Sequence, residues 1–178
     1  MRIALIGHSG AGKSTTVAFL IDGLASRGLR SEIVKLATPL YELQQRFRSA
    51  AGVELPPDVQ DQVLLEDIAV QLRRLNERAL ADGFLRRVNA SAADVIINDD
   101  LRDPDVDAAV LRDNGFRIVR VQAPEEVRLR RLKARGDIST SDASSQGIHR
   151  IPVDATLTNS GSVDALRSQI TDLLEVLL

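Results

Sequence analysis

The chain has 178 residues, enough for one domain with a core of several strands covered by helices. Hydrophobic residues make up 44% and charged residues 27%, ordinary values that argue against disorder, and the net charge of −2 argues against a protein that coats nucleic acid. The absence of cysteine excludes disulfides and thiolate chemistry.

No apolar run in the sequence approaches the roughly 18 residues that a membrane-spanning helix needs. The first predicted strand starts within two residues of the amino terminus, which leaves no room for a cleavable signal. We therefore expect a cytoplasmic protein that makes no membrane contact and forms a single domain over residues 1–178.

The first predicted elements are a strand, a glycine-rich turn and a helix. Residues 3–6 form an unbroken apolar run, typical of a strand buried on both faces of a parallel sheet. Apolar residues at helical spacing follow the turn and end near Gly28, a plausible residue just past a helix end. The turn between them reads G-x-x-x-x-G-K-S over residues 7–14, the spacing of a P-loop.

Each residue type in this turn has a separate task around a polyphosphate. Glycines let backbone N–H groups turn toward an anion, and the following helix adds the positive end of its dipole. Lys13 would reach the β- and γ-phosphates, and the Ser14 hydroxyl would ligate the bridging Mg²⁺. The sequence therefore predicts an ATP and Mg²⁺ site built from Gly7, His8, Ser9, Gly10, Ala11, Gly12, Lys13, Ser14 and Thr15.

A second strand is predicted over residues 31–36, so the chain opens with a right-handed β–α–β unit. Pro39 suits the first turn of the helix that follows. The carboxyl end of a strand beside the P-loop strand is where an open α/β sheet places ligands. Lys35, Thr38 and Tyr41 are therefore candidates to contact the second substrate. A solvated lysine and a half-buried packing tyrosine are equally good explanations of Lys35 and Tyr41.

Two further helices are predicted over residues 61–75 and 77–88, after a loop at residues 50–59. They form an insertion between the second and third strands. Arg73 and Arg74 close the first of these helices, and a solvated face explains them better than a phosphate contact.

The third predicted strand, over residues 93–98, ends in Asp99 and Asp100. In P-loop proteins such a strand delivers a carboxylate that holds Mg²⁺ or its water, or accepts a proton from the attacking group. Neighbouring side chains on an extended backbone point in opposite directions, so we expect only one of the two to face the loop. The alternative is a pair of surface turn aspartates.

The second half of the chain alternates helices and strands. Pro104 begins a helix, residues 116–121 form the fourth strand, and residues 125–135 form a helix that carries Arg128, Arg131 and Arg135 on one face. A solvated arginine face is the usual explanation of such a run, but guanidinium groups there could also act on a migrating phosphoryl group. Residues 136–147, rich in Ser, Asp and Thr, indicate a mobile lid or plain disorder.

A last strand over residues 155–159 and a helix over residues 163–178, with Ser162 as its N-cap, close the chain.

With these motifs in place, the chain resembles the P-loop nucleoside and nucleotide kinases, most closely the deoxynucleoside monophosphate kinase-like group and its dephospho-coenzyme A kinase relatives. Beyond the P-loop, the resemblance rests on residues 37–40, 100–104, 131–135 and 158–161, and it extends nearly end to end. In that group an acid-x-Arg-x-Pro segment follows the third strand, which corresponds to Asp100 and Arg102. The group often has a glutamate two residues after the proline, where this chain has Val106.

The resemblance implies a three-layer α/β P-loop fold with a five-stranded parallel sheet in the order 2-3-1-4-5. It further implies a helical acceptor-binding region over residues 37–90, a lid over residues 128–150, ATP with Mg²⁺ as the donor, and a phosphate monoester as the acceptor. By the same comparison, Arg131 and Arg135 resemble lid arginines that clamp ATP phosphates. Asn159 and Gly161 resemble the turn that borders the adenine.

The function predicted from these residues is transfer of the γ-phosphoryl group of ATP to a nucleoside monophosphate, including deoxy or modified nucleotides. No strong general base is needed, because an acceptor phosphate is already ionised. We expect a monomer or homodimer that forms no stable complex with nucleic acid. The expected catalytic residues are Lys13, Asp100, Arg102, Arg131 and Arg135; Ser14 with Asp99 or Asp100 would hold the metal; and Lys35, Thr38, Tyr41 and Arg102 would bind the acceptor.

Three alternatives stay open. In a dephospho-coenzyme A or nucleoside kinase, an aspartate near the acceptor would have to take a proton from a hydroxyl group. The arginine-rich helix also permits a polynucleotide end kinase, whose binding would depend steeply on salt. A regulatory ATPase or switch would hydrolyse ATP without an acceptor. The sequence contains no guanine-reading N-K-x-D motif.

Overall fold

The computed structural model describes residues 1–53, 61–135 and 147–178, and its centre is one parallel β-sheet. The strands lie in the order β2-β3-β1-β4-β5, which confirms the predicted order. Every neighbouring pair runs parallel. The strands are β1 (Arg2–Ile6), β2 (Ser31–Ile33), β3 (Val95–Asn98), β4 (Arg117–Gln122) and β5 (Ala155–Thr158).

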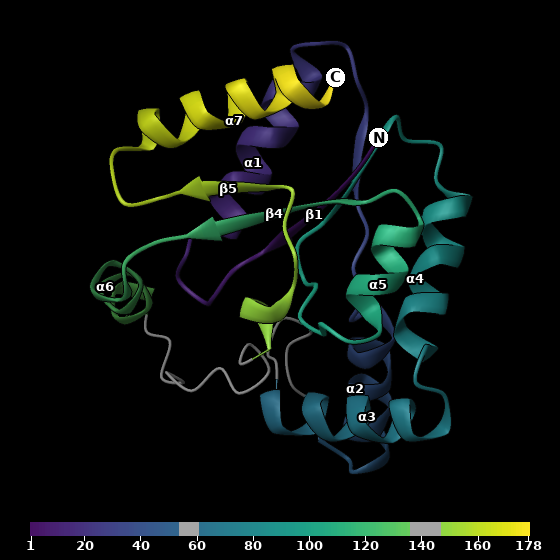
Figure 1. The fold of residues 1–178 in the computed structure, drawn as a ribbon. Helices are drawn as coiled ribbons and strands as arrows, with labels where there is room; N and C mark the ends of the chain where they lie inside the picture. The colour runs from purple at the N-terminus through teal and green to yellow at the C-terminus, as the bar shows by residue number, and fades with distance from the viewer. Residues whose placement is uncertain (54–60, 136–146) are drawn as a thin grey trace.

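Helices cover both faces of this sheet, so the predicted three-layer α/β fold is confirmed (Figure 1). One face packs against α1 (Lys13–Ala25) and α7 (Val163–Leu177). The other face packs against α2 (Thr38–Ala50), α3 (Gln62–Leu75), α4 (Ala79–Ala90) and α5 (Asp107–Asp113). The α6 helix (Glu125–Arg135) lies beyond the carboxyl end of β4, and a short 3₁₀ turn, η2 (Ile148–Arg150), precedes β5 (Figure 1).

The first strand divides its side chains between the two cores. Ala4 and Ile6 belong to the core under α2 to α5, whereas Ile3 and Leu5 belong to the core under α1 and α7. All four are fully buried. Both faces of the central strand are covered, which is why its sequence shows no alternation of polar and apolar residues.

Three helix starts show how local sequence sets the chain's direction. Asp61 accepts a hydrogen bond from the Leu64 amide at 3.1 Å and begins α3. Ser162 accepts one from the Ala165 amide at 3.2 Å and begins α7, as predicted. The α1 helix differs, because Gly12 stands at its N-cap and no side chain caps it. Its first amides therefore remain available to a ligand.

Among the elements that are shorter than the sequence predicts, β2 and α5 each have an aspartate that explains the difference. The β2 strand ends at Ile33 rather than residue 36, because the Leu36 and Ala37 amides donate to the Asp100 carboxylate at 2.9 Å each instead of joining the sheet. The α5 helix begins at Asp107 rather than Pro104. The Asp103 carboxylate accepts the amides of residues 105–107 and holds that segment in a turn first.

No helix within the three described ranges has the length and apolar character that a membrane-spanning helix needs. The loop predicted at residues 136–147 falls, except for Gly147, outside the described residues, as does most of the loop predicted at residues 50–59.

A buried amide joins the ends of β2 and β3. The fully buried Asn98 side chain donates to the Val34 carbonyl at 3.0 Å and to the Asp100 carboxylate at 2.6 Å, and it accepts from the Leu101 amide at 3.0 Å. Because each partner is itself removed from water, the loss of this side chain would leave several polar groups unsatisfied.

We therefore expect Asn98→Ala to lower the free energy of unfolding by about 2–4 kcal/mol, because it orphans these buried groups. Urea unfolding followed by circular dichroism measures this. The matched control is Asn89→Ala on the exposed face of α4, with an expected change within about 0.5 kcal/mol. Equal midpoints for the two variants would contradict the role given to Asn98.

Candidate active site

The glycine-rich turn after β1 adopts backbone angles that favour glycine, at Gly10 and Gly12 among other positions. Gly10 has φ of 77° and Gly12 has φ of 103°. A Cβ atom at Gly10 would lie 2.7 Å from the Arg128 carbonyl oxygen, and one at Gly12 would collide with the Asn159 amide. The turn therefore needs glycine both for its backbone angles and for its close contact with α6 and the segment after β5.

Lys13 folds back over this turn. Its Nζ atom donates to the Gly7 carbonyl at 2.6 Å, so the lysine side chain reaches from the end of the loop back to its first residue. Ser14 and Thr15 are exposed in the first turn of α1, which carries no acidic residue. Uncapped amides, the positive end of the helix dipole and a lysine thus meet at one place, the combination that binds a phosphate chain.

Residues from the far end of the chain hold the turn in place. Asn159 donates its side-chain amide to the Ala11 carbonyl at 2.8 Å. Arg131 of α6 donates to the Asn159 side-chain oxygen at 3.1 Å and to the Gly10 carbonyl at 3.4 Å. The structure therefore brings the predicted residues Arg131 and Asn159 onto the P-loop backbone. Gly161 is exposed two residues further on, and the side chain of Arg135 lies outside the described part of the chain.

Arg128 joins the same contact; the predicted arginine face of this helix includes it, whereas the residues implied by the family resemblance do not. Its Nη1 atom donates to the Ser9 carbonyl at 3.2 Å. The spacing of Arg128 and Arg131, three residues apart on one helix face, is the sequence signal that identifies both. One guanidinium group per helical turn thus reaches the phosphate loop.

Asp99 and Asp100 have separate environments. Both oxygens of Asp100 accept backbone amides, from Leu36 and Ala37, and burial raises the pKa of its carboxyl group even against these hydrogen bonds. Asp99 instead lies 3.4 Å from the Lys35 ammonium. That contact is made by its buried Oδ1 atom, which has no other polar partner within the described residues. Of the two carboxylates, that of Asp99 keeps unused acceptor capacity.

Lys35 and Thr38 lie at the carboxyl end of β2, next to this pair. Thr38 donates its hydroxyl to the Lys35 carbonyl at 3.1 Å, which shapes the start of α2. Partial burial lowers the pKa of Lys35, but the charges of Asp99 and Asp100 outweigh it and raise the pKa above its ordinary value. The ammonium group therefore stays charged across the physiological pH range.

A cavity of about 410 Å³ opens between α2, α3 and the segment that follows β3. Its apolar wall comes mainly from Leu36, Leu40 and Leu65. Tyr41 and Arg102, both predicted to bind the acceptor, line it as well. Burial raises the pKa of the Tyr41 phenol, and the charge of Asp100 adds to this, so the hydroxyl is a neutral hydrogen-bond donor at neutral pH.

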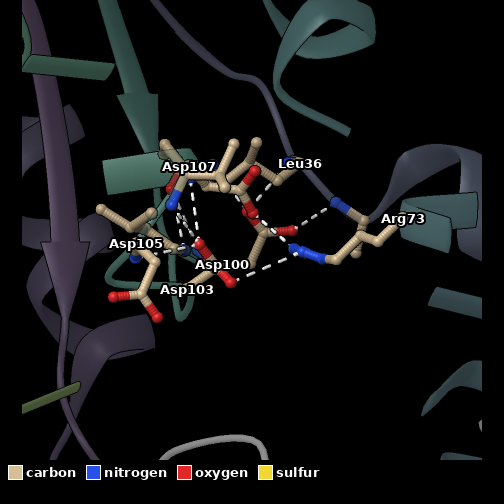
Figure 2. Close-up of polar contacts among 10 residues, drawn as sticks. Leu36, Arg73, Asp100, Asp103, Asp105 and Asp107 are labelled. Carbon is tan, nitrogen blue, oxygen red and sulfur yellow. Dashed lines mark hydrogen bonds and ion pairs between the residues drawn. The ribbon is translucent and has the colours of Figure 1, made fainter. Parts of the chain in front are cut away.

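Arg73 binds the acidic segment after β3 rather than facing solvent, so the solvated face expected for it is wrong (Figure 2). Its Nη2 atom lies 2.6 Å from the buried Asp107 carboxylate and its Nη1 atom 3.7 Å from Asp103. The sequence gives no local signal for this ion pair, because the two partners lie 34 residues apart. Arg74, the next residue, is exposed as expected.

The same acidic segment also holds the chain that leads into β5. Arg150 donates both terminal nitrogens to Asp105, at 2.9 and 3.0 Å. A Cβ atom at Gly147 would lie 3.0 Å from the Pro104 ring. The turn that carries Arg102 is thus fixed from two sides, by α3 and by η2.

The fold and the glycine-rich loop define a P-loop protein, and a family model described as an AAA domain matches residues 3–151. This match spans well over half of the chain, which therefore belongs to the AAA domain family AAA_33. No curated protein matches the sequence.

Several solved structures have the same fold. TT1252 from Thermus thermophilus is 19% identical, with a TM-score of 0.59 over 100% of this chain and 98% of that chain. The APS kinase CysC from Mycobacterium tuberculosis, in complex with AMPPNP and APS, is 20% identical, with a TM-score of 0.56 over 98% and 96% of the two chains. Shikimate kinase from Acinetobacter baumannii, in complex with shikimate, is 15% identical, with a TM-score of 0.54 over 99% and 92%. At such identities the likeness establishes the fold.

The environment of Asp107 predicts a pH dependence of stability. Burial raises its pKa from 3.8 to about 6, against the attraction of Arg73 and with the help of Asp103 and Asp100. The folded state therefore keeps a proton that the unfolded chain releases between about pH 4 and pH 6. This residue's contribution to stability is full below about pH 4 and falls by about 3 kcal/mol as the pH rises to 7.

We expect Asp107→Asn to remove that part of the pH dependence. Urea unfolding at several pH values from 4 to 7 measures the difference between the variant and the wild type. The control is Asp113→Asn, an exposed aspartate on the same helix, which should follow the wild type. A wild-type slope retained in Asp107→Asn would show that Asp107 titrates normally in the folded protein.

Proposed function

We propose that the protein is an ATP-dependent kinase that transfers the γ-phosphoryl group to the phosphate of a nucleoside monophosphate. The observation that supports this proposal is that two sites lie at the carboxyl ends of two neighbouring strands. The phosphate loop leaves the carboxyl end of β1, and the segment that lines the cavity leaves the carboxyl end of β3, the neighbouring strand. A donor and an acceptor bound there would meet between the two strands.

The donor phosphates would lie in the loop of residues 7–15. Lys13 would exchange its contact with the Gly7 carbonyl for the β- and γ-phosphates. Arg128 and Arg131 already contact the loop backbone and would neutralise charge on the transferring group, with Arg135 as the third arginine of the helix. Asn159, with Gly161 close by, would border the adenine, and residues 128–150 would form the lid.

The residues also fit a magnesium ion. Mg²⁺ takes one or two protein ligands and completes its shell with water and phosphate oxygens, and it would supply charge neutralisation at the phosphates. The exposed Ser14 hydroxyl and the carboxylate of Asp99, whose Oδ1 atom contacts only Lys35 among the described residues, suit that requirement. Asp100 is less suited because the Leu36 and Ala37 amides occupy its oxygens. Its proposed role is to shape the acceptor site.

The acceptor would occupy the cavity between α2 and α3. Its apolar wall with one tyrosine suits a flat base, and Arg102, which lines the cavity, would hold the acceptor phosphate. Lys35 does not line the cavity; it lies beside Asp99 at the neighbouring strand end and would assist from there. Asp100, the acid of the acid-x-Arg-x-Pro segment, is engaged by backbone amides and is therefore poorly suited to deprotonate a hydroxyl. This favours a phosphate acceptor.

Phosphorylation of a hydroxyl group is the second candidate, because a solved shikimate kinase has the same fold. The two functions differ in the product. A monophosphate acceptor gives a nucleoside diphosphate, whereas a hydroxyl acceptor gives a new phosphate monoester.

ATP consumption with Mg²⁺ should be stimulated by at least one ribo- or deoxyribonucleoside monophosphate. The comparison panel contains nucleosides, dephospho-coenzyme A, shikimate and 5′-hydroxyl oligonucleotides. Lys13→Ala should lower kcat by about a hundredfold or more, because it removes the positive charge that stabilises the transferring phosphoryl group. Arg27→Ala, which removes an exposed cation beyond the other end of α1, is the control and should act as the wild type.

Three other results would count against the proposal. Stimulation by a hydroxyl compound alone would replace it with the second candidate. Hydrolysis at the same rate with and without acceptors would indicate a regulatory ATPase. Full activity of Lys13→Ala would show that Lys13 of the loop takes no part in the reaction.

A further inference from the structure

Within the described part of the chain, one carboxylate in the cavity wall is bound by no arginine and by no backbone amide. Four of the cavity's five acidic lining residues are bound by backbone amides or arginines: Asp100 by Leu36 and Ala37, Asp103 and Asp107 by Arg73, and Asp105 by Arg150. The fifth is Glu66. Among the described residues, its one polar contact is the amide of Gln62 on the same helix, at 2.8 Å.

Glu66 lies on the face of α3 that forms the cavity wall. Gln62, Glu66, Ala69 and Arg73 all line the cavity, and their spacing of four, three and four residues places them in one stripe along the helix. Asp67, the next residue, is exposed and does not line the cavity. The Glu66 carboxylate is therefore placed toward a bound acceptor, on the α3 wall.

The chemistry of this wall defines what it can bind. An ionised carboxylate only accepts hydrogen bonds, and it pairs best with two parallel N–H groups. Gln62 orients one carboxylate oxygen and has a second N–H to donate. The wall thus presents one donor beside two acceptors. The complementary base edge has a carbonyl group, a ring N–H and an exocyclic amino group in a row.

We propose that Glu66 selects the base of the acceptor and that the acceptor is a guanine nucleoside monophosphate. This rests on the proposed function, because it takes a nucleoside monophosphate as the acceptor. Guanine has the carbonyl, the ring N–H and the amino group in the required order. Uracil and thymine place a carbonyl oxygen on each side of their N–H, and adenine and cytosine place a ring nitrogen lone pair beside their amino group. Each would set a lone pair against the carboxylate, which disfavours binding.

The test compares kcat/KM for GMP, IMP, AMP, CMP and UMP with saturating ATP and Mg²⁺. IMP is the sharpest comparison, because it lacks only the exocyclic amino group. We expect GMP to exceed IMP by about tenfold or more, the effect of one hydrogen bond to a charged group, and to exceed the other three by a larger factor. Glu66→Gln should lose most of the preference for GMP over IMP. Asp67→Asn, the matched control, should keep it.

Two outcomes overturn the inference and leave the proposed function intact. One is a substrate preference for a monophosphate other than GMP. The other is an unchanged ratio of GMP to IMP in Glu66→Gln that folds normally by urea unfolding. If no monophosphate is phosphorylated, the proposed function fails instead. Calorimetric binding of GMP and IMP then decides the inference separately: tighter binding of GMP that depends on Glu66 supports it, and equal or absent binding overturns it.

Discussion

The carboxylate of Asp100 and its two backbone amides determine how the rest of this protein is arranged. By accepting the amides of Leu36 and Ala37, it turns the chain out of β2 and starts α2 where the cavity needs a wall. The side-chain amide of Asn98 donates a further hydrogen bond to the same carboxylate and helps to hold it in place. A charged group replaces further sheet pairing here, and the space that opens between α2, α3 and the segment after β3 is the candidate acceptor site.

The candidate donor site depends on a second set of contacts, made by residues that follow β4 and β5 on the other side of β1. Asn159 follows β5 and Arg131 follows β4, yet both bind the backbone of the loop that follows β1. The loop is therefore held by groups that follow two other strands, and not by its own sequence alone. Since Gly12 leaves space for the Asn159 side chain, the sequence of the loop and the sequence near residue 159 depend on each other.

The sequence predicts those features that local chemistry determines. The P-loop, the strand before it and the N-cap at Ser162 all agree with the structure. The order of the strands agrees as well, but it was implied by the family resemblance rather than by local sequence. The sequence does not predict side-chain contacts between residues that lie far apart in the chain. An arginine that closes an amphipathic helix has the pattern of a solvated residue, and only the fold shows that Arg73 meets Asp107. Likewise, two successive aspartates are equivalent until the Leu36 and Ala37 amides distinguish them.

The short β2 strand has a consequence for association between molecules. It forms an edge of the sheet and contains three residues, with Ile33 41% exposed. A longer edge would offer a row of free amides to a strand from another copy. Asp100 stops the strand from extending, because it binds the Leu36 and Ala37 amides and turns the chain away from the sheet. The carboxylate that shapes the cavity thereby also shortens the surface on which β-sheet aggregation could begin.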